Sequence, residues 1–259
     1  MRKRADIIKC YTEINSETWD RWAQDGNEWS VPITHEEYLN VTEENFAVYL
    51  TPCVAVPHEW FGGLRGKKLL GLASGGGQQM PVFSKLGASC TVFDNSARQL
   101  ESERMVSERE GYSIEIIKGD MTKRLPFENE SFDIIFHPVS NCYIKDVYHV
   151  WNECFRILKK GGRLLAGFDN GLSFLFNYDD PLRVVNKLPF DPLSMTSEQL
   201  EEMLKQREGV QFSHTLEEQI GGQLKAGFTL KALYEDRDRP GGAAIGEYAP
   251  QYIATLSVK

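Results

Sequence analysis

The stretch Leu69-Leu70-Gly71-Leu72-Ala73-Ser74-Gly75-Gly76-Gly77-Gln78-Gln79 decides the fold. It begins as an apolar strand, passes through a glycine-rich turn and leads into a predicted helix over residues 78–86. Glycines let a backbone approach a ligand where a Cβ would collide, and the start of a helix presents unpaired N–H groups with a partial positive charge. Strand, glycine turn and helix in this order predict a cradle for a cofactor.

Apolar strands and amphipathic helices alternate from residue 67 onward. Helices are predicted over residues 96–110, with Ser96 as N-cap and Gly111 as the stop, and over residues 146–158, ended by the Lys-Lys-Gly-Gly run at 159–162. A capping box formed by Thr215 and Glu218 predicts a further helix before the sixth strand. We predict strands at residues 67–72, 89–93, 113–118, 132–136, 163–168, 229–234 and 252–258.

The linker before the last strand fixes that strand's direction. Residues 236–250 are too polar and glycine-rich for a crossover helix, and a short non-helical connection joins antiparallel neighbours. The predicted fold class is therefore α/β: a doubly wound, Rossmann-like sheet of seven strands, mostly parallel, with an antiparallel last strand.

Two segments interrupt or precede the alternation. Residues 1–66 hold four of the five tryptophans, and we interpret them as an aromatic-rich flap or cap. The flap either packs its aromatic side chains onto the main domain or forms a lid over a substrate pocket. Residues 67–259 form the main domain, with an insertion at about 169–214 that is rich in proline and aromatic residues.

Composition narrows the classes of partner. The net charge of −8 disfavours a nucleic acid, and no apolar run approaches the ~20 residues that span a bilayer. The lack of a spanning apolar run argues against a membrane protein. The five cysteines are scattered without a CxxC pair or a zinc spacing, so we expect a reducing cytoplasm and no metal site. The sequence leaves open whether the protein is a monomer or a homodimer.

The glycine turn does not complete the dinucleotide fingerprint. Gly75 and Gly77 match the first two glycines of the G-x-G-x-x-G motif, but Met80 occupies the third position. The third glycine permits close packing of the helix on the strand, so a methionine there counts against a dinucleotide. Asp94 follows the second strand where a carboxylate binds ribose hydroxyls, but any adenosine cofactor would use it. An NAD(P)-dependent oxidoreductase stays as the alternative at this point.

A series of motifs in order resembles the class I S-adenosylmethionine-dependent methyltransferases, in particular their bacterial small-molecule branch (methyltransferase type 11-like). The resemblance covers roughly residues 67–259. Its parts are the glycine turn, Asp94, the Gly-Asp-Met run at 119–121, the Leu-Pro-Phe run at 125–127 before strand four, the run 156–164 (Arg-Ile-Leu-Lys-Lys-Gly-Gly-Arg-Leu) and the Ala-Gly-Phe run at 226–228. The antiparallel last strand is also typical of that family.

The resemblance implies a binding site for S-adenosyl-L-methionine, with S-adenosylhomocysteine as product, and methyl transfer to a small-molecule acceptor. Asp94 would accept hydrogen bonds from the ribose hydroxyls and Asp120 from the adenine amino group, and the glycine turn would lie against the methionine part. The family usually has an acidic residue where Gly71 stands and a glycine where Ala73 stands, and the missing acid keeps a non-catalytic cofactor-binding protein as a further alternative. The residues implied to bind the cofactor are Ala73, Ser74, Gly75, Gly76, Gly77, Asp94, Asn95, Gly119, Asp120, Met121, His137 and Pro138.

His137 is the one candidate for a general base, and its alternative role is to line the cofactor site through its backbone. Asn141 and Tyr143 either orient a polar acceptor or serve the loop and helix cap, and His214 is either a catalyst or a cap or core residue. The candidates for the substrate pocket are Trp19, Trp29, Asn141, Tyr143, Phe174 and His214.

Overall fold

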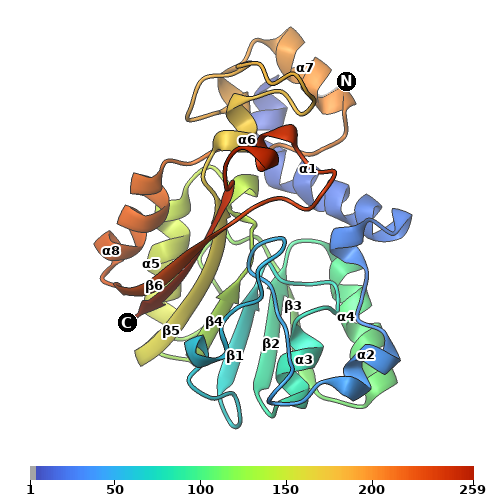
Figure 1. Ribbon diagram of the computed structural model, residues 1–259, viewed down its shortest axis with the longest axis vertical. Coiled ribbons are helices and arrows are strands. Elements are labelled where there is room, and N and C mark those ends of the chain that lie inside the picture. The colour runs from blue at the N-terminus through green and yellow to red at the C-terminus, as the bar shows by residue number, and fades with distance from the viewer. Residues whose placement is uncertain (1–3) are drawn as a thin grey trace.

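The computed structural model describes residues 4–259 and contains one seven-stranded sheet with the order β3-β2-β1-β4-β5-β7-β6 (Figure 1). The strands are β1 (Lys68–Leu72), β2 (Ser89–Asp94), β3 (Ile114–Lys118), β4 (Phe132–His137), β5 (Leu158–Asp169), β6 (Thr229–Asp236) and β7 (Tyr252–Val258). The α-helices are α1 (Arg4–Asp25), α2 (His35–Asn40), α3 (Met80–Lys85), α4 (Ala97–Glu110), α5 (Val147–Ile157), α6 (Leu172–Leu175), α7 (Ser197–Lys205) and α8 (Gly222–Ala226). None of the helices within residues 4–259 is long and apolar enough to cross a bilayer.

The direction of the last strand is confirmed. β1 to β5 pair in parallel, whereas β7 runs antiparallel to both β5 and β6. The chain order changes direction between β1 and β4, so the crevice at the carboxyl ends of these strands is the expected ligand site of an open α/β sheet.

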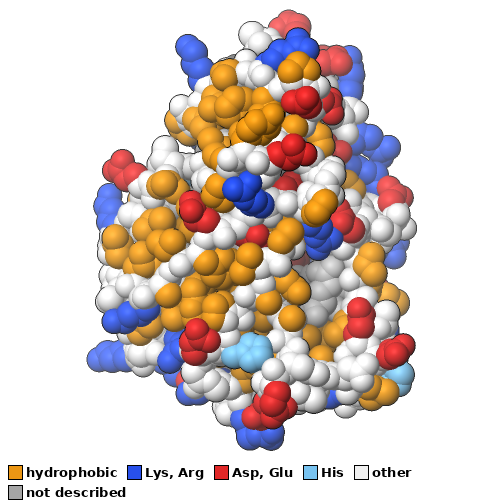
Figure 2. All heavy atoms as spheres, viewed as in Figure 1, with side chains coloured by type: hydrophobic (Ala, Val, Ile, Leu, Met, Phe, Trp, Pro, Cys, Tyr) orange, Lys and Arg blue, Asp and Glu red, His pale blue; other side chains and the backbone are white. Residues whose placement is uncertain are grey.

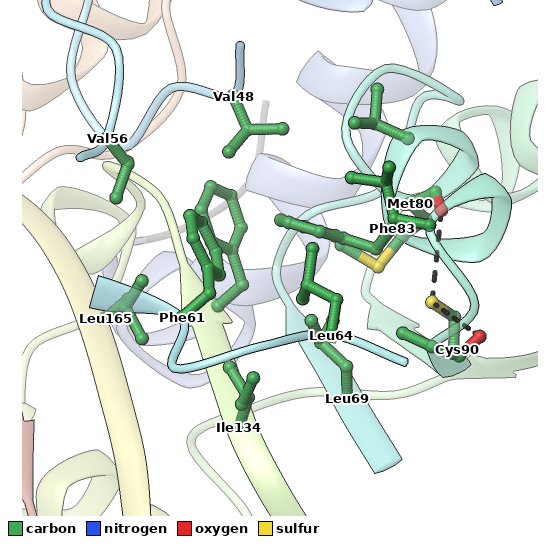
Figure 3. Packing of buried hydrophobic residues seen from close by; sticks show 14 of the residues in the cluster. Val48, Val56, Phe61, Leu64, Leu69, Met80, Phe83, Cys90, Ile134 and Leu165 are labelled. Carbon is green, nitrogen blue, oxygen red and sulfur yellow. Dashed lines mark hydrogen bonds between the residues drawn. The ribbon is translucent and has the colours of Figure 1, made fainter. Parts of the chain in front are cut away.

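The two faces of the sheet bury separate apolar clusters, because successive side chains of a strand point to opposite faces. Leu69 of β1 packs in one cluster with α3, whereas Leu70 packs in the other with Trp151 of α5. Figure 3 shows the first cluster, in which Phe61 from the N-terminal segment lies beside Leu165 of the sheet and near Phe83. Apolar side chains of residues 46–64 thus form part of the hydrophobic core on this face of the sheet.

Local signals explain most helix ends, and three of the differences from the predicted boundaries have a clear physical reason. Ser96 accepts a hydrogen bond from the N–H of Gln99 as N-cap of α4, and Gly111 ends that helix in the left-handed conformation, as predicted. Helix α3 begins at Met80, because the glycine turn extends to Gln79, and β5 begins at Leu158, because that residue pairs with Phe132.

The third difference lies before β6. The Thr215–Glu218 capping box forms, but the helix it opens is a π-helical turn over Glu217–Gly221 that continues as α8. Gly222 lies against Trp151: a Cβ there would be 2.6 Å from Trp151 Cδ1. The wide turn and the absent side chain let α8 approach α5 closely, which the four-residue apolar spacing does not reveal.

Helix α1 and residues 170–214, together called the cap, lie over one end of the sheet (Figure 1). Ile7 of α1 packs with Leu200 of α7 and with Phe212. Asn15 of α1 connects this helix to residues 170–214, since its side-chain amide donates to the carbonyl of Val210 at 2.9 Å. The same amide donates to the carbonyl of Tyr143, in the segment after β4, at 3.0 Å. Figure 2 shows hydrophobic side chains gathered over the cap and a hollow in the surface below it.

Candidate active site

The glycine turn is held in shape by hydrogen bonds from its own backbone. The N–H of Ala73 donates to the carbonyl of Phe93, that of Gly75 to Asp94 Oδ2 at 3.0 Å, and that of Gly77 to Glu103 Oε2 at 2.9 Å. Ala73 has φ +50°, in the left-handed region that favours glycine, which explains why the resembling family usually has glycine there.

The space beside Gly71 is filled by Met80. A Cβ at position 71 would lie 2.6 Å from Met80 Sδ and 2.7 Å from its Cε, and Met80 is completely buried. A side chain at position 71 would therefore require the end of the Met80 side chain to move. The two departures that the sequence shows, a missing acid at 71 and a methionine in place of the third fingerprint glycine, thus lie in direct contact.

Asp94 is a preorganised acceptor at the end of β2. Its Oδ2 accepts the N–H of Gly75 and its Oδ1 accepts the N–H of Ser96 at 2.8 Å. Burial raises the pKa of Asp94, and these backbone donors oppose the rise. A carboxylate has about four lone-pair sites, so each oxygen keeps acceptor capacity for a ligand.

Neighbouring strand ends complete this side of the site. Gly119 at the end of β3 donates its N–H to the carbonyl of Asp94, and a Cβ on Gly119 would lie 2.3 Å from Phe93 Cζ. Asp120 Oδ1 accepts the N–H of Thr122 at 2.8 Å, which fixes its carboxylate. Asn95 is bound to α1, since its side-chain amide donates to the carbonyl of Thr12 at 2.9 Å. The cap is thereby attached directly to the edge of the site.

One cavity of about 1610 Å³ lies between these strand ends and the cap. Most of the residues implied to bind the cofactor line it, together with four of the candidates for the substrate pocket. Gly76, Gly77 and His137 are not among the lining residues. Those that line it are Ala73, Ser74, Gly75, Asp94, Asn95, Gly119, Asp120, Met121, Pro138, Trp19, Trp29, Tyr143 and Phe174.

The geometry does not fit His137 as a general base. Its side chain is completely buried, Nδ1 lies 2.9 Å from the Leu72 carbonyl oxygen, and Nε2 lies 2.9 Å from Asn141 Oδ1. Burial lowers the pKa of His137, so the ring is held neutral in the core, against Trp151. The histidine joins β1 to β4 and has no free nitrogen for a ligand.

Asn141 and His214 are likewise core residues. The Asn141 amide donates to Gln219 Oε1 at 2.8 Å, and His214 Nε2 lies 2.9 Å from the carbonyl oxygen of Ile144. Neither lines the cavity. The prediction that Asn141 and His214 contact the acceptor is therefore corrected. Their side chains hydrogen-bond to Gln219 and to backbone carbonyls in the core instead.

The aromatic candidates lie on the cap side of the cavity. Trp19 of α1 packs edge-on against Tyr143 with ring centroids 5.6 Å apart, and Phe174 stacks on Phe190 at 5.6 Å. The guanidinium of Arg239 lies over the Trp29 ring, with its Cζ 4.2 Å from the ring centroid.

Sequence reasoning missed several lining residues. Asp169 ends β5, Tyr252 begins β7, and Asp238 and Arg239 belong to the hairpin loop that follows β6. Asp169 carries the same signal as Asp94, a carboxylate directly after an apolar strand, and the sequence could have revealed it. Arg239 has no local signal, since only the fold of the hairpin brings it to Glu28 and Trp29.

Comparison with known proteins identifies the chain's family. Residues 70–166 match the family model described as a methyltransferase domain. The Bacillus subtilis (strain 168) protein named "Uncharacterized methyltransferase YbaJ" is 40% identical over 250 residues, which cover 95% of this chain and 97% of that protein. The chain belongs to the S-adenosylmethionine-dependent methyltransferases. This methyltransferase is an enzyme that uses S-adenosylmethionine, so the oxidoreductase and the non-catalytic binding protein are set aside.

Two further likenesses are more distant. A ubiquinone biosynthesis O-methyltransferase of Klebsiella pneumoniae is 25% identical to the methyltransferase over 103 residues, 40% of this chain and 43% of that protein. A crystal structure of an S-adenosylmethionine-dependent methyltransferase from Mesorhizobium loti matches with a TM-score of 0.62 at 16% identity, over 76% of this chain and 92% of that one. The second match shows the shared fold.

The hydrogen-bond acceptors of the methyltransferase fit this cofactor. Two carboxylates, Asp94 and Asp120, stand at neighbouring strand ends on the cavity wall, and each is fixed by a backbone N–H while keeping acceptor capacity. Ribose hydroxyls and an adenine amino group are donors that need such acceptors. Among residues 4–259 no group of three or more His, Cys, Asp or Glu is arranged to hold a metal ion.

Proposed function

We propose that this methyltransferase transfers the methyl group to a small-molecule acceptor bound between the sheet and the cap. The observation that carries the proposal is the cavity of about 1610 Å³, which has carboxylates at strand ends on one side and aromatic side chains on the other. Pockets for one small ligand are typically about 300–1,000 Å³, so this cavity has room for the cofactor and a second small molecule.

The sheet side of the cavity would hold the cofactor. Asp94 would accept from the ribose hydroxyls, Asp120 from the adenine amino group, and the turn from Ala73 to Gly75 would lie against the methionine part. S-adenosylmethionine supplies an electrophilic methyl group on a sulfonium, so the chain's task is to bring an acceptor into line with it and to exclude water. Asp94 is well suited to its part because Gly75 and Ser96 fix its orientation before any ligand binds.

The cap side would hold the acceptor. Trp19, Tyr143 and Phe174 present flat apolar surfaces to the cavity, which favour an organic molecule with an apolar body. The name of the Klebsiella relative, an O-methyltransferase of ubiquinone biosynthesis, supports an acceptor of small size. The net charge of −8 works against a nucleic acid as acceptor.

A labelling experiment tests the acceptor class. The purified protein is incubated with trideuteromethyl S-adenosylmethionine and a cell extract separated into small-molecule, protein and nucleic-acid fractions, with the Asp94→Ala variant as the control that lacks the ribose acceptor. We expect deuterated methyl groups in the small-molecule fraction with the wild type and not with the variant. Label confined to protein or nucleic acid would contradict the proposal.

A further inference from the structure

Asp169 is a buried carboxylate with one oxygen that has no partner. It ends β5 and only 4% of its surface is exposed. Its Oδ1 accepts the N–H of Gly171 at 3.0 Å, whereas its Oδ2 has no hydrogen-bond partner among the described residues. The residue lines the cavity. A buried acceptor without a partner destabilises the folded state, so a ligand that donates a hydrogen bond to Asp169 Oδ2 would remove this penalty.

The position of Asp169 separates it from the proposed cofactor contacts. Ala166 of β5 pairs with His137 of β4, so Asp169 lies three residues beyond the end of β4 and opposite Tyr252 of β7. β5 is three strands from β2 in the sheet, which at about 4.8 Å per strand separates Asp169 from Asp94 by roughly 14 Å across the sheet alone. Asp169 therefore lies away from the proposed ribose contact, on the side of the cavity that Tyr143 and Tyr252 also line.

The charged groups on that side favour a cation. Among the described residues that line the cavity, Arg239 is the only one with a basic side chain, and it pairs with Glu28 at 2.5 Å while stacking on Trp29. Asp238 accepts the N–H groups of Arg239 and Ala243 within its own loop. Asp169 is a lining carboxylate with a buried oxygen that has no partner among the described residues, and an anionic acceptor would be repelled by all of these acids.

We propose that the methyl acceptor is an amine and that Asp169 binds its ammonium group and removes the proton that blocks the nitrogen lone pair; this rests on the small-molecule function proposed above. The Asp169 carboxylate takes one proton from the ammonium, the freed lone pair forms the N–C bond to the methyl group, and the C–S bond breaks with its electrons remaining on sulfur. The products are a methylated ammonium, S-adenosylhomocysteine and protonated Asp169, which returns its proton to solvent.

The surroundings of Asp169 suit this role. Burial raises the pKa of Asp169 to about 7, so the carboxylate is a better proton acceptor than an exposed aspartate while still ionised in part at neutral pH. The titratable groups facing it are Cys142, Tyr143 and Tyr252, whose pKa values are raised by burial and, to a smaller extent, by the negative charge of Asp169. All three are neutral at pH 7, so none supplies a competing cation.

Calorimetry with three probes of similar shape tests the inference. Benzylammonium, benzyl alcohol and benzoate are titrated into the full chain in the presence of saturating S-adenosylhomocysteine. The wild type should bind benzylammonium at least tenfold more tightly than benzyl alcohol, with benzoate weakest. Asp169→Asn keeps an acceptor for the Gly171 N–H but loses the charge, so it should lose this preference. Asp179→Asn removes an exposed charge in the same insertion, outside the cavity, and should retain it.

Proton release gives a readout that a purely structural role would not change. Binding of a cation beside Asp169 lowers its pKa, so at pH 7 the wild type should release up to about half a proton, measured in buffers of different ionisation enthalpy. Asp169→Asn should release none. Equal binding of the three probes, no binding of benzylammonium, or an unchanged preference in Asp169→Asn would each overturn the inference. Absence of S-adenosylhomocysteine binding to the wild type would instead overturn the proposed function.

Discussion

Replacing Glu103 with glutamine should make the protein more stable at alkaline pH. The Glu103 side chain is completely buried beneath the glycine turn, where Oε2 accepts the N–H of Gly77 and Oε1 accepts the hydroxyl of Tyr112 at 3.1 Å. Burial raises the pKa of Glu103 from 4.5 to about 7, an increase that the two donors oppose. Glutamine has the same shape as the protonated acid, keeps an acceptor for Gly77 and never ionises.

The magnitude follows from the two pKa values. A carboxyl whose pKa is raised on folding makes its full contribution to stability below pH 4.5 and loses it as the pH rises through about 7. At about 1.4 kcal/mol per pKa unit, ionisation of Glu103 costs the folded state about 3 kcal/mol at pH 8.5. We therefore expect Glu103→Gln to raise the free energy of unfolding by about 2–3 kcal/mol at pH 8.5 and by little at pH 5.

Urea denaturation at pH 5, 6, 7 and 8.5 measures this difference. The matched control is Glu108→Gln, which removes an exposed carboxylate from the same helix and should follow the wild type at every pH. Parallel pH profiles of Glu103→Gln and the wild type would refute the reasoning, as would a variant that is less stable than the wild type at pH 8.5.

Three further substitutions test separate parts of the site and fold. Asp94→Ala should weaken S-adenosylhomocysteine binding in calorimetry by at least about 1.5 kcal/mol, or about tenfold, and unchanged affinity would remove Asp94 from the cofactor site. Ala73→Gly should raise the free energy of unfolding by about 1 kcal/mol because it relieves a positive φ, and a fall in stability would show that the turn is not strained. Gly222→Ala should destabilise by about 1–3 kcal/mol because its Cβ would collide with Trp151, whereas at Gly221 the nearest atom would be 3.6 Å away, so Gly221→Ala should have little effect.

The sheet and the cofactor side could be predicted because their signals are local. Asp94 and Asp120 follow apolar strands directly, and the carboxyl ends of parallel strands meet at one edge wherever the helices lie. The antiparallel direction of β7 follows from the composition of a single linker. Asp169 obeys the same rule, but it lay at the edge of the insertion, where the strand–helix alternation stops.

The predictions that failed concern the direction of side chains. His137 ends β4 and Asn141 follows it, as predicted, but both side chains turn into the core. The His137 ring lies against the Leu72 carbonyl and Trp151, and the Asn141 amide donates to Gln219. These partners come from segments far away in the sequence, and no local pattern reveals them. The roles of the residues that do line the cavity stay predictions until a ligand is seen there.

A crystal structure of the protein with S-adenosylhomocysteine tests the central claim most directly. The account predicts both ribose hydroxyls within hydrogen-bond distance of Asp94, the adenine amino group at Asp120, and the sulfur facing the part of the cavity that Tyr143 and Asp169 line. A nucleoside bound elsewhere, with Asp94 bonded only to Gly75 and the backbone of Ser96, would contradict it.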